Sequence, residues 1–330
     1  MIYPWLQHEW QRWVESAEAN RIPHALLLTG LAGLGKTHFA AMMVRSFFCK
    51  QYVLSGETMP NADCICHACQ LITGETHPNV LRIHAEETKI IKIDAIRAAC
   101  NFMAQTAVQG KYRIIIIESA HKMNHYAANA LLKTLEEPAP DGIIILVTDQ
   151  EGHLPATIRS RCNRRIFTKP NHSIAHAWLS NQLTSTDVSF LLHLAHGAPL
   201  KALALAKDDQ LQARKNLYDN LILLSQHKTN PVDATNQLGH IELAILIEHF
   251  IIWIKDLMHL KLQTGNQQII SQDFLPSLSQ ISPAMSLTSL LKILNFARHY
   301  RLQIEQGINL NKQLLMETLF YHFEASLSCS

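Results

Sequence analysis

The sequence has no strong excess of charge of either sign, because 29 Lys and Arg residues nearly balance 27 Asp and Glu and leave a formal net charge of +2. This balance implies no large basic surface, so any contact with nucleic acid would have to be local or shared with partners. A long uninterrupted apolar run is also absent. The longest, at residues 243–257, contains Glu248, His249, Lys255 and Asp256, which argues against a membrane span.

No charged segment leads into an apolar one at residues 1–5, as a secretory signal would require, so we expect a cytoplasmic protein. In a reducing compartment, the seven cysteines are expected to be metal ligands or buried thiols in preference to disulfides. With 330 residues, the chain is longer than a domain with one hydrophobic core usually is, and 48% of its residues are hydrophobic. Two or three well-packed domains are therefore expected.

The most specific motif is a complete Gly-x-x-x-x-Gly-Lys-Thr phosphate loop at residues 30–37, preceded by an apolar run and followed by a helical pattern. Glycines allow backbone N–H groups to turn around phosphate oxygens, and the following helix directs its positive end at the same anion. Lys36 would reach the outer phosphates and Thr37 would hold Mg²⁺. The predicted nucleotide-binding residues of the loop, for ATP or ADP, are Gly30, Gly33, Gly35, Lys36 and Thr37.

Four cysteines lie close together within residues 49–69, in a polar segment with little core of its own. Four thiolates can form a tetrahedral, structural Zn²⁺ site, which leaves no open position for catalysis. His67 is an alternative to one of the thiolates, and unrelated loop thiols are the simpler alternative to a metal site. The predicted ligands are Cys49, Cys64, Cys66 and Cys69.

The apolar runs 114–117 and 143–147 predict strands that are buried on both faces. In phosphate-loop NTPases such a strand end carries an acidic Mg²⁺ ligand and, in many members, a second carboxylate that activates water. Glu118 can serve the first role, whereas Ser119 cannot serve the second. Thr148 ends the later strand, and it would either sense the outermost phosphate or cap its own turn.

Hydrophobic periodicity predicts the remaining helices and strands. Amphipathic helices are predicted at 5–18, 93–103 and 124–137, with a strand at 80–83, and the chain is helical from about residue 173 onward. Four arginines within residues 159–165 indicate a solvated or phosphate-contacting face. No titratable constellation stands out after residue 208, so packing or oligomerisation is the expected role there.

Together these segments resemble the clamp-loader branch of the AAA+ ATPases. The resemblance covers nearly all of the first 205 residues and is most specific in Leu-Leu-Lys-Thr-Leu-Glu-Glu-Pro at 131–138 and Ser-Arg-Cys at 160–162. It implies an α/β fold with a parallel sheet: a AAA+ domain over 1–168 with the inserted cysteine module, a helical lid domain over 169–207, and a helical collar over 208–330 for oligomerisation.

The resemblance also implies a role for Arg161, as a finger acting on ATP bound by the neighbouring subunit. A guanidinium suits this role because its planar fork matches phosphate oxygens. An internal salt bridge is the structural alternative. The implied partners are the delta and tau or gamma clamp-loader subunits and, through the complex, the sliding clamp and primed DNA.

Departures from the family's motor subunits indicate a weak ATPase. Ser119 replaces the general base, and Leu200 stands where a nucleotide-contacting arginine is expected, with Lys201 one position away. A positioned base contributes roughly 10²- to 10⁴-fold in rate and an arginine finger on the order of 10³- to 10⁵-fold. We therefore expect a subunit that hydrolyses ATP poorly but helps its neighbour. The alternatives are an active tau- or gamma-type motor, and a kinase or transferase with a zinc module, for which no acceptor site is visible.

Overall fold

The computed structural model describes residues 2–52, 64–85, 90–108, 110–183, 188–207, 210–263, 268–306 and 308–327. The chain forms two compact units, one made of residues 1–184 with 197–202 and the other of residues 185–196 with 203–330. The finer division into three domains, with boundaries after residues 168 and 207, stays a prediction. No helix in the described ranges is long and apolar enough to cross a membrane.

The first unit is built on a five-stranded parallel sheet with strand order β2-β3-β4-β1-β5. The central strands consist almost entirely of buried aliphatic residues, as expected for a parallel sheet that is covered on both faces. The strands are β1 (Ala25–Gly30), β2 (Val80–Ile83), β3 (Arg113–Ile117), β4 (Gly142–Thr148) and β5 (Asn163–Phe167).

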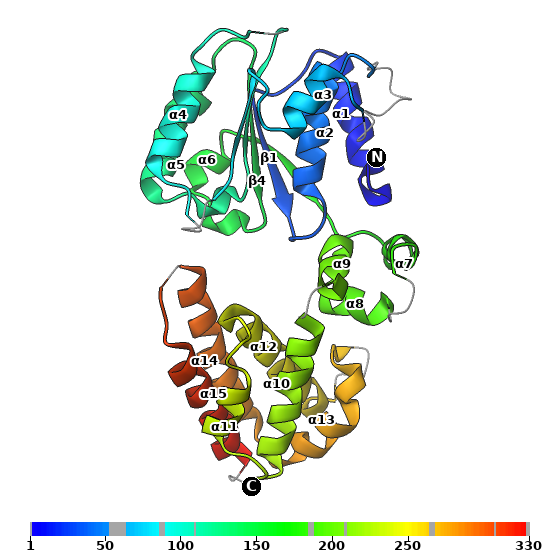
Figure 1. The fold of residues 1–330 in the computed structure, drawn as a ribbon, viewed down its shortest axis with the longest axis vertical. Coiled ribbons are helices and arrows are strands. Elements are labelled where there is room, and N and C mark those ends of the chain that lie inside the picture. Colours follow the sequence, from blue (N-terminus) through cyan, green and yellow to red (C-terminus); the bar gives the residue numbers. More distant parts are fainter. Residues whose placement is uncertain are drawn as a thin grey trace. The chain divides into compact units, whose positions relative to one another are not determined.

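Alternate residues of the three central strands β1, β3 and β4 face two separate helical layers (Figure 1). Leu26 and Leu28 pack with Trp10, Trp13 and Phe39 on the side of α1 and α2. Leu27 and Ile115 pack on the opposite side, against α4 and α5. The helices of this unit are α1 (Gln7–Glu18), α2 (Lys36–Phe48), α3 (His67–Thr73), α4 (Ile93–Met103), α5 (His125–Glu136), α6 (Ala156–Arg159), α7 (His172–Ser180) and the start of α9 (Pro199–Lys207), with 3₁₀ turns η1 (Pro4–Leu6), η2 (Ala120–Lys122) and η3 (Glu151–His153).

Several predicted elements agree closely with the structure. The helix after the phosphate loop begins at Lys36, and β2 and α4 have the predicted bounds. Asn124 caps α5, because its side-chain oxygen accepts a hydrogen bond from the backbone N–H of Ala127 at 2.8 Å. The edge strand β5 includes two of the four clustered arginines, Arg164 and Arg165, which take part in its parallel pairing with β1.

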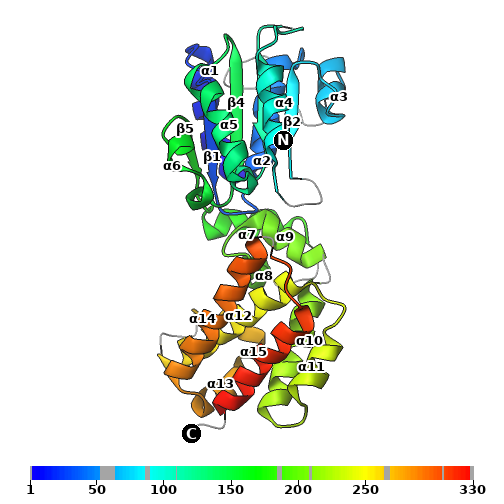
Figure 2. The same cartoon turned by 90° about the vertical axis from the view of Figure 1, so that its left-hand side faces the viewer.

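In the described residues of the second unit, all of the regular secondary structure is helical (Figure 2). Its centre is α12, which is buried along most of its length around Phe250 and Trp253. The helices are α8 (Val188–Leu194), the end of α9, α10 (Gln210–Ser225), α11 (Pro231–Gln237), α12 (Leu243–Lys261), α13 (Leu275–Ile281), α14 (Leu287–Glu305) and α15 (Lys312–Leu327), with 3₁₀ turns η5 (Gln272–Phe274) and η6 (Ser282–Ala284).

Candidate functional site

The phosphate loop connects the end of β1 to the start of α2, at the carboxyl edge of the sheet. Gly33 and Gly35 adopt φ angles of +80° and +91°, in the left-handed region where a side chain would be strained. Gly35 is the N-cap of α2, so the helix begins at Lys36. The loop therefore lies between a strand and a helix start, as the sequence motif predicts, and its binding of phosphate stays a prediction.

Lys36 lies at the centre of this loop, with only 3% of its side chain exposed. Its ammonium donates to the carbonyl oxygens of Gly30 at 2.7 Å and Leu31 at 2.6 Å, and lies 2.6 Å from the Asp149 carboxylate. Burial lowers the pKa of Lys36, while the carboxylate of Asp149 opposes that shift. The lysine is therefore charge-paired within the chain. Asp149, next to Thr148, was not among the residues predicted to bind nucleotide.

Two segments that are distant in sequence pack on the loop. A Cβ atom added to Gly35 would lie 2.8 Å from the Tyr3 ring, and Tyr3 stacks on Trp5. On the other side, the backbone N–H of Leu200 donates to the Gly33 carbonyl at 3.1 Å, and a Cβ at Gly33 would lie 2.6 Å from Lys201. Lys201, which the sequence analysis treated as one position away from the family's arginine, is thus in direct contact with the loop.

Glu118 follows β3 and contacts a cation that the sequence analysis missed. Its Oε1 lies 3.2 Å from Nε of Arg82, which comes from the neighbouring strand β2. The next residue, Ser119, has a φ angle of +51° and begins the turn η2, and it supplies no carboxylate. The role of Glu118 as a Mg²⁺ ligand stays a prediction.

Thr148 is fully buried at the end of β4, and its hydroxyl group has two partners. Its Oγ1 accepts from the backbone N–H of Gln150 at 3.1 Å and lies 3.1 Å from Nδ1 of His121. The hydroxyl thus caps its own turn, which was one of the two alternatives, and phosphate sensing stays a prediction. Burial lowers the pKa of His121, which favours the neutral imidazole next to Thr148.

Arg161 lies just after α6 and is paired within the chain. Its Nη2 lies 2.5 Å from Oε1 of Glu136, and its Nη1 donates to the Thr157 carbonyl at 2.9 Å. The internal salt bridge considered for this residue is therefore present. Both side chains remain partly exposed, 36% for Arg161 and 49% for Glu136, and ion pairs of this kind are weak enough to exchange partners.

The four predicted metal ligands come together, although they lie in three short segments. The sulfur atoms of Cys49, Cys64, Cys66 and Cys69 all lie within 4.8 Å of one another. The Sγ of Cys49 lies 3.6 Å from that of Cys64 and 4.0 Å from that of Cys66. Zinc–sulfur bonds of about 2.3 Å in a tetrahedron place sulfurs about 3.8 Å apart, so the cluster fits a four-thiolate metal site.

The surroundings of the cluster favour the deprotonated thiolate form of Cys66. Hydrogen bonds from the backbone, above all from Cys69, lower the pKa of Cys66 to about 6, whereas burial raises the pKa of Cys49. His67, the considered alternative ligand, is not among the four groups that converge in the described residues. The chain can therefore hold a metal ion through four sulfurs.

Comparisons with known proteins agree with this architecture. A family model described as "DNA polymerase III, delta subunit" matches residues 5–171, and one described as "DNA polymerase III, delta subunit, C terminal" matches residues 208–325. The DNA polymerase III subunit delta' of Escherichia coli is 30% identical over 326 residues, covering 98% of this chain and 95% of that protein. Its counterpart in Pseudomonas aeruginosa is 29% identical over 322 residues, with 96% of each chain covered.

A solved structure shares the fold. It is a DNA polymerase III, gamma subunit-related protein from Thermotoga maritima, which aligns with a TM-score of 0.53 and 17% identity over 97% of this chain and 99% of that chain. The phosphate loop, the four-cysteine cluster and the family models thus lead to one conclusion. This chain belongs to the DNA polymerase III delta' subunit family.

Proposed function

We propose that this chain acts in the cytoplasm as the delta' subunit of a DNA polymerase III clamp loader. With delta and tau or gamma subunits, it assists ATP-dependent loading of the sliding clamp onto primed DNA. The observation that carries this proposal is the match to a delta' subunit over 98% of the chain, which includes the helical second unit as well as the sheet.

Within that role, Arg161 serves as a finger for ATP bound by the adjacent subunit. Its partners in this chain, Glu136 and the Thr157 carbonyl, lie outside the phosphate loop, and the side chain is partly exposed. A partner subunit that presents phosphate oxygens offers a more highly charged acceptor than one carboxylate. The guanidinium then exchanges Glu136 for the neighbour's nucleotide.

The chain's own loop binds ATP or ADP with Mg²⁺ but supports little hydrolysis. The backbone and Lys36 have the geometry of a phosphate cradle, which supports binding. Ser119 carries no carboxylate that could activate water, which supports slow turnover. We expect measurable nucleotide binding by calorimetry on the isolated chain together with negligible steady-state hydrolysis, whereas a motor subunit would hydrolyse ATP steadily.

The four cysteines hold a structural Zn²⁺ ion, because four sulfur ligands at these separations suit its size and leave no catalytic position. The ion would fasten the segment before α3 to the end of α2. Its own chemistry plays no part in clamp loading.

The test of the whole proposal is reconstitution. The full chain is mixed with delta, tau or gamma subunits, the clamp and primed DNA, and subunit stoichiometry, bound zinc and clamp loading are measured on the same sample. We expect the chain to co-purify in the complex and its omission to abolish ATP-dependent loading. A complex that assembles and loads clamps equally well without it would contradict the proposal.

A further inference from the structure

The two charged groups that would meet a nucleotide with its metal ion are both already paired inside the chain. Lys36, which would contact phosphate, is paired with Asp149. Glu118, which would contact Mg²⁺, is paired with Arg82. An anion thus stands against the lysine and a cation against the glutamate, which are the charges that a nucleotide and its metal would bring.

The pairing of Lys36 is close and largely shielded from water. Its ammonium has three oxygen acceptors within 2.7 Å, and these match the three donor hydrogens of the group. Lys36 can donate to a phosphate oxygen only when it gives up one of these three contacts. The two carbonyl oxygens belong to the loop backbone, so the Asp149 side chain, which is 38% exposed, is the contact that can move away.

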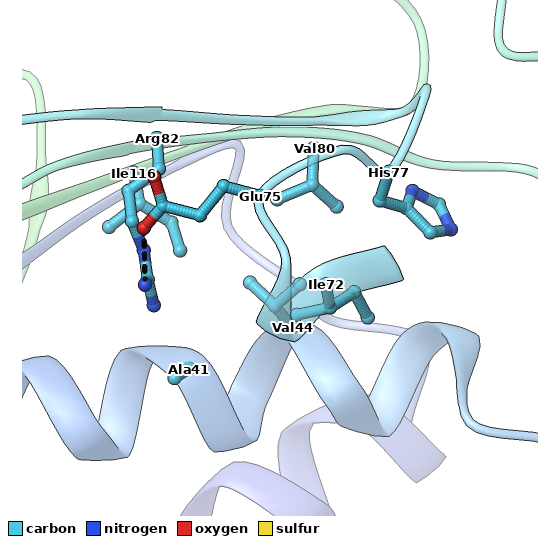
Figure 3. Close-up of a pocket in the computed structure, with 8 residues that line it drawn as sticks. All are labelled: Ala41, Val44, Ile72, Glu75, His77, Val80, Arg82 and Ile116. Carbon is cyan, nitrogen blue, oxygen red and sulfur yellow. Dashed lines mark hydrogen bonds and ion pairs between the residues drawn. The ribbon is translucent and has the colours of Figure 1, made fainter. Parts of the chain in front are cut away.

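The pairing of Glu118 involves a third residue. The Arg82 guanidinium bridges two carboxylates, with Nε 3.2 Å from Glu118 and Nη1 3.0 Å from Glu75, the second of which is drawn in Figure 3. Arg82 cannot lose its charge at any physiological pH. Glu118 is therefore held by a permanent cation.

Glu75 lies in the turn that follows α3, in a left-handed conformation that recurs after other helices of the chain. It has a φ angle of +56° just beyond α3, where the backbone N–H of Thr76 donates to the Leu71 carbonyl at 2.9 Å. Helices usually place glycine in this left-handed position, and another residue type costs energy there. The carboxylate of Glu75 is the second partner of the Arg82 guanidinium.

The pocket around these residues is too small for a nucleotide. It lies between α2, α3 and the sheet, lined by Val44, Ile72 and Ile116 as well as the Glu75–Arg82 pair (Figure 3). Its volume of about 10 Å³ is close to the space of one water molecule. Arg82 therefore acts on Glu118 through its charge.

We propose that this chain carries its own counter-ions at the phosphate loop, with Asp149 in place of an outer phosphate and Arg82 in place of Mg²⁺, so that nucleotide binds only by displacing them. The inference rests on the proposed role of the loop but does not involve Arg161. It makes Asp149 a competitor of the phosphates and Arg82 a positioning residue that keeps Glu118 from the metal.

The two counter-ions predict different responses to magnesium. Asp149→Asn removes the anion that competes for Lys36, so affinity for nucleotide should rise by about tenfold with or without Mg²⁺. Arg82→Gln releases Glu118, so affinity should rise by about threefold to tenfold, and only when Mg²⁺ is present. The double variant R82Q/E118Q should lose this magnesium-dependent gain.

The experiment is equilibrium binding of a fluorescent mant-ADP probe to the full-length chain, with Mg²⁺ or with EDTA. Asp141→Asn is a matched control, because Asp141 also pairs with a lysine, Lys111 at 3.2 Å, but at the opposite edge of the sheet. Arg97→Gln is the control for Arg82, since Arg97 pairs with Asp94 on the exposed side of α4. Both controls should stay within about twofold of the wild-type affinity.

A second measurement, thermal unfolding with and without ADP, confirms that each variant is folded and reports affinity independently, because a ligand stabilises the folded state according to its Kd. The proposal is overturned if the folded Asp149→Asn variant binds mant-ADP no better than the wild-type chain does. It is also overturned if neither protein binds mant-ADP detectably. A magnesium-independent gain in Arg82→Gln would overturn the role given to Arg82. Failure of the Arg161 finger or of clamp loading would leave these binding results unaffected.

Discussion

Arg161 and Glu136 join the two most family-specific motifs of the chain, with Nη2 of the arginine 2.5 Å from Oε1 of the glutamate. Because both side chains are partly exposed, the pair contributes little to folding, and we expect Glu136→Ala to lower the free energy of unfolding by no more than about 1 kcal/mol. Urea denaturation measures this, with Glu137→Ala as the neighbouring control. A loss above about 2 kcal/mol would mean that Arg161 is a structural residue and not a mobile finger.

The cysteine cluster should hold zinc only when all four sulfurs are present. We expect Cys69→Ser to reduce bound zinc from about one ion per chain to nearly none and to lower the melting temperature, because the ion closes a segment with little core of its own. Cys100→Ser is the control, since Cys100 lies outside the cluster, where it accepts a hydrogen bond from Thr134. Metal analysis that finds equal zinc in both variants would contradict the assignment.

His77 should make the stability of the first unit depend on pH. Burial, reinforced by the nearby His67, lowers the pKa of His77, whose Nδ1 accepts a hydrogen bond from the backbone N–H of Asn79 at 3.2 Å. Because the folded pKa lies below the unfolded value, the neutral ring stabilises the fold above about pH 6.5, and this contribution is lost as pH falls. Unfolding free energies measured at pH 7 and pH 5 should differ less for His77→Gln than for wild type. Exposed His84→Gln should behave as wild type, and a parallel response of the two variants would contradict this role.

The sequence could predict those parts of the fold that depend on local patterns. The runs of isoleucine in β3 and β4 indicate strands with two buried faces, and the Gly-Lys-Thr sequence fixes the start of α2. The four thiols were predictable as a cluster because cysteine has few other uses in a polar loop. Each of these predictions depends only on residues that lie near one another in the sequence.

The partners of the charged residues could not be predicted in the same way. Arg82 reaches Glu118 because β2 and β3 pair in parallel, and that register is a property of the sheet and not of either segment. Asp149 reaches Lys36 because β4 lies next to β1 although other strands intervene in sequence. Glu118 and Lys36 could therefore be predicted from the sequence as ligands for a metal ion and a nucleotide, but the internal charges that pair with them could not.

We propose that this chain contributes to ATP hydrolysis mainly at a nucleotide bound by a neighbouring subunit. The most direct measurement is DNA-stimulated ATP hydrolysis by the reconstituted clamp loader carrying Arg161→Ala, compared with Arg159→Ala, an exposed arginine two positions earlier. We predict that Arg161→Ala slows hydrolysis at the adjacent site by on the order of 10³-fold or more, with assembly intact, and that Arg159→Ala leaves it near the wild-type rate. An unchanged rate with Arg161→Ala would contradict the account.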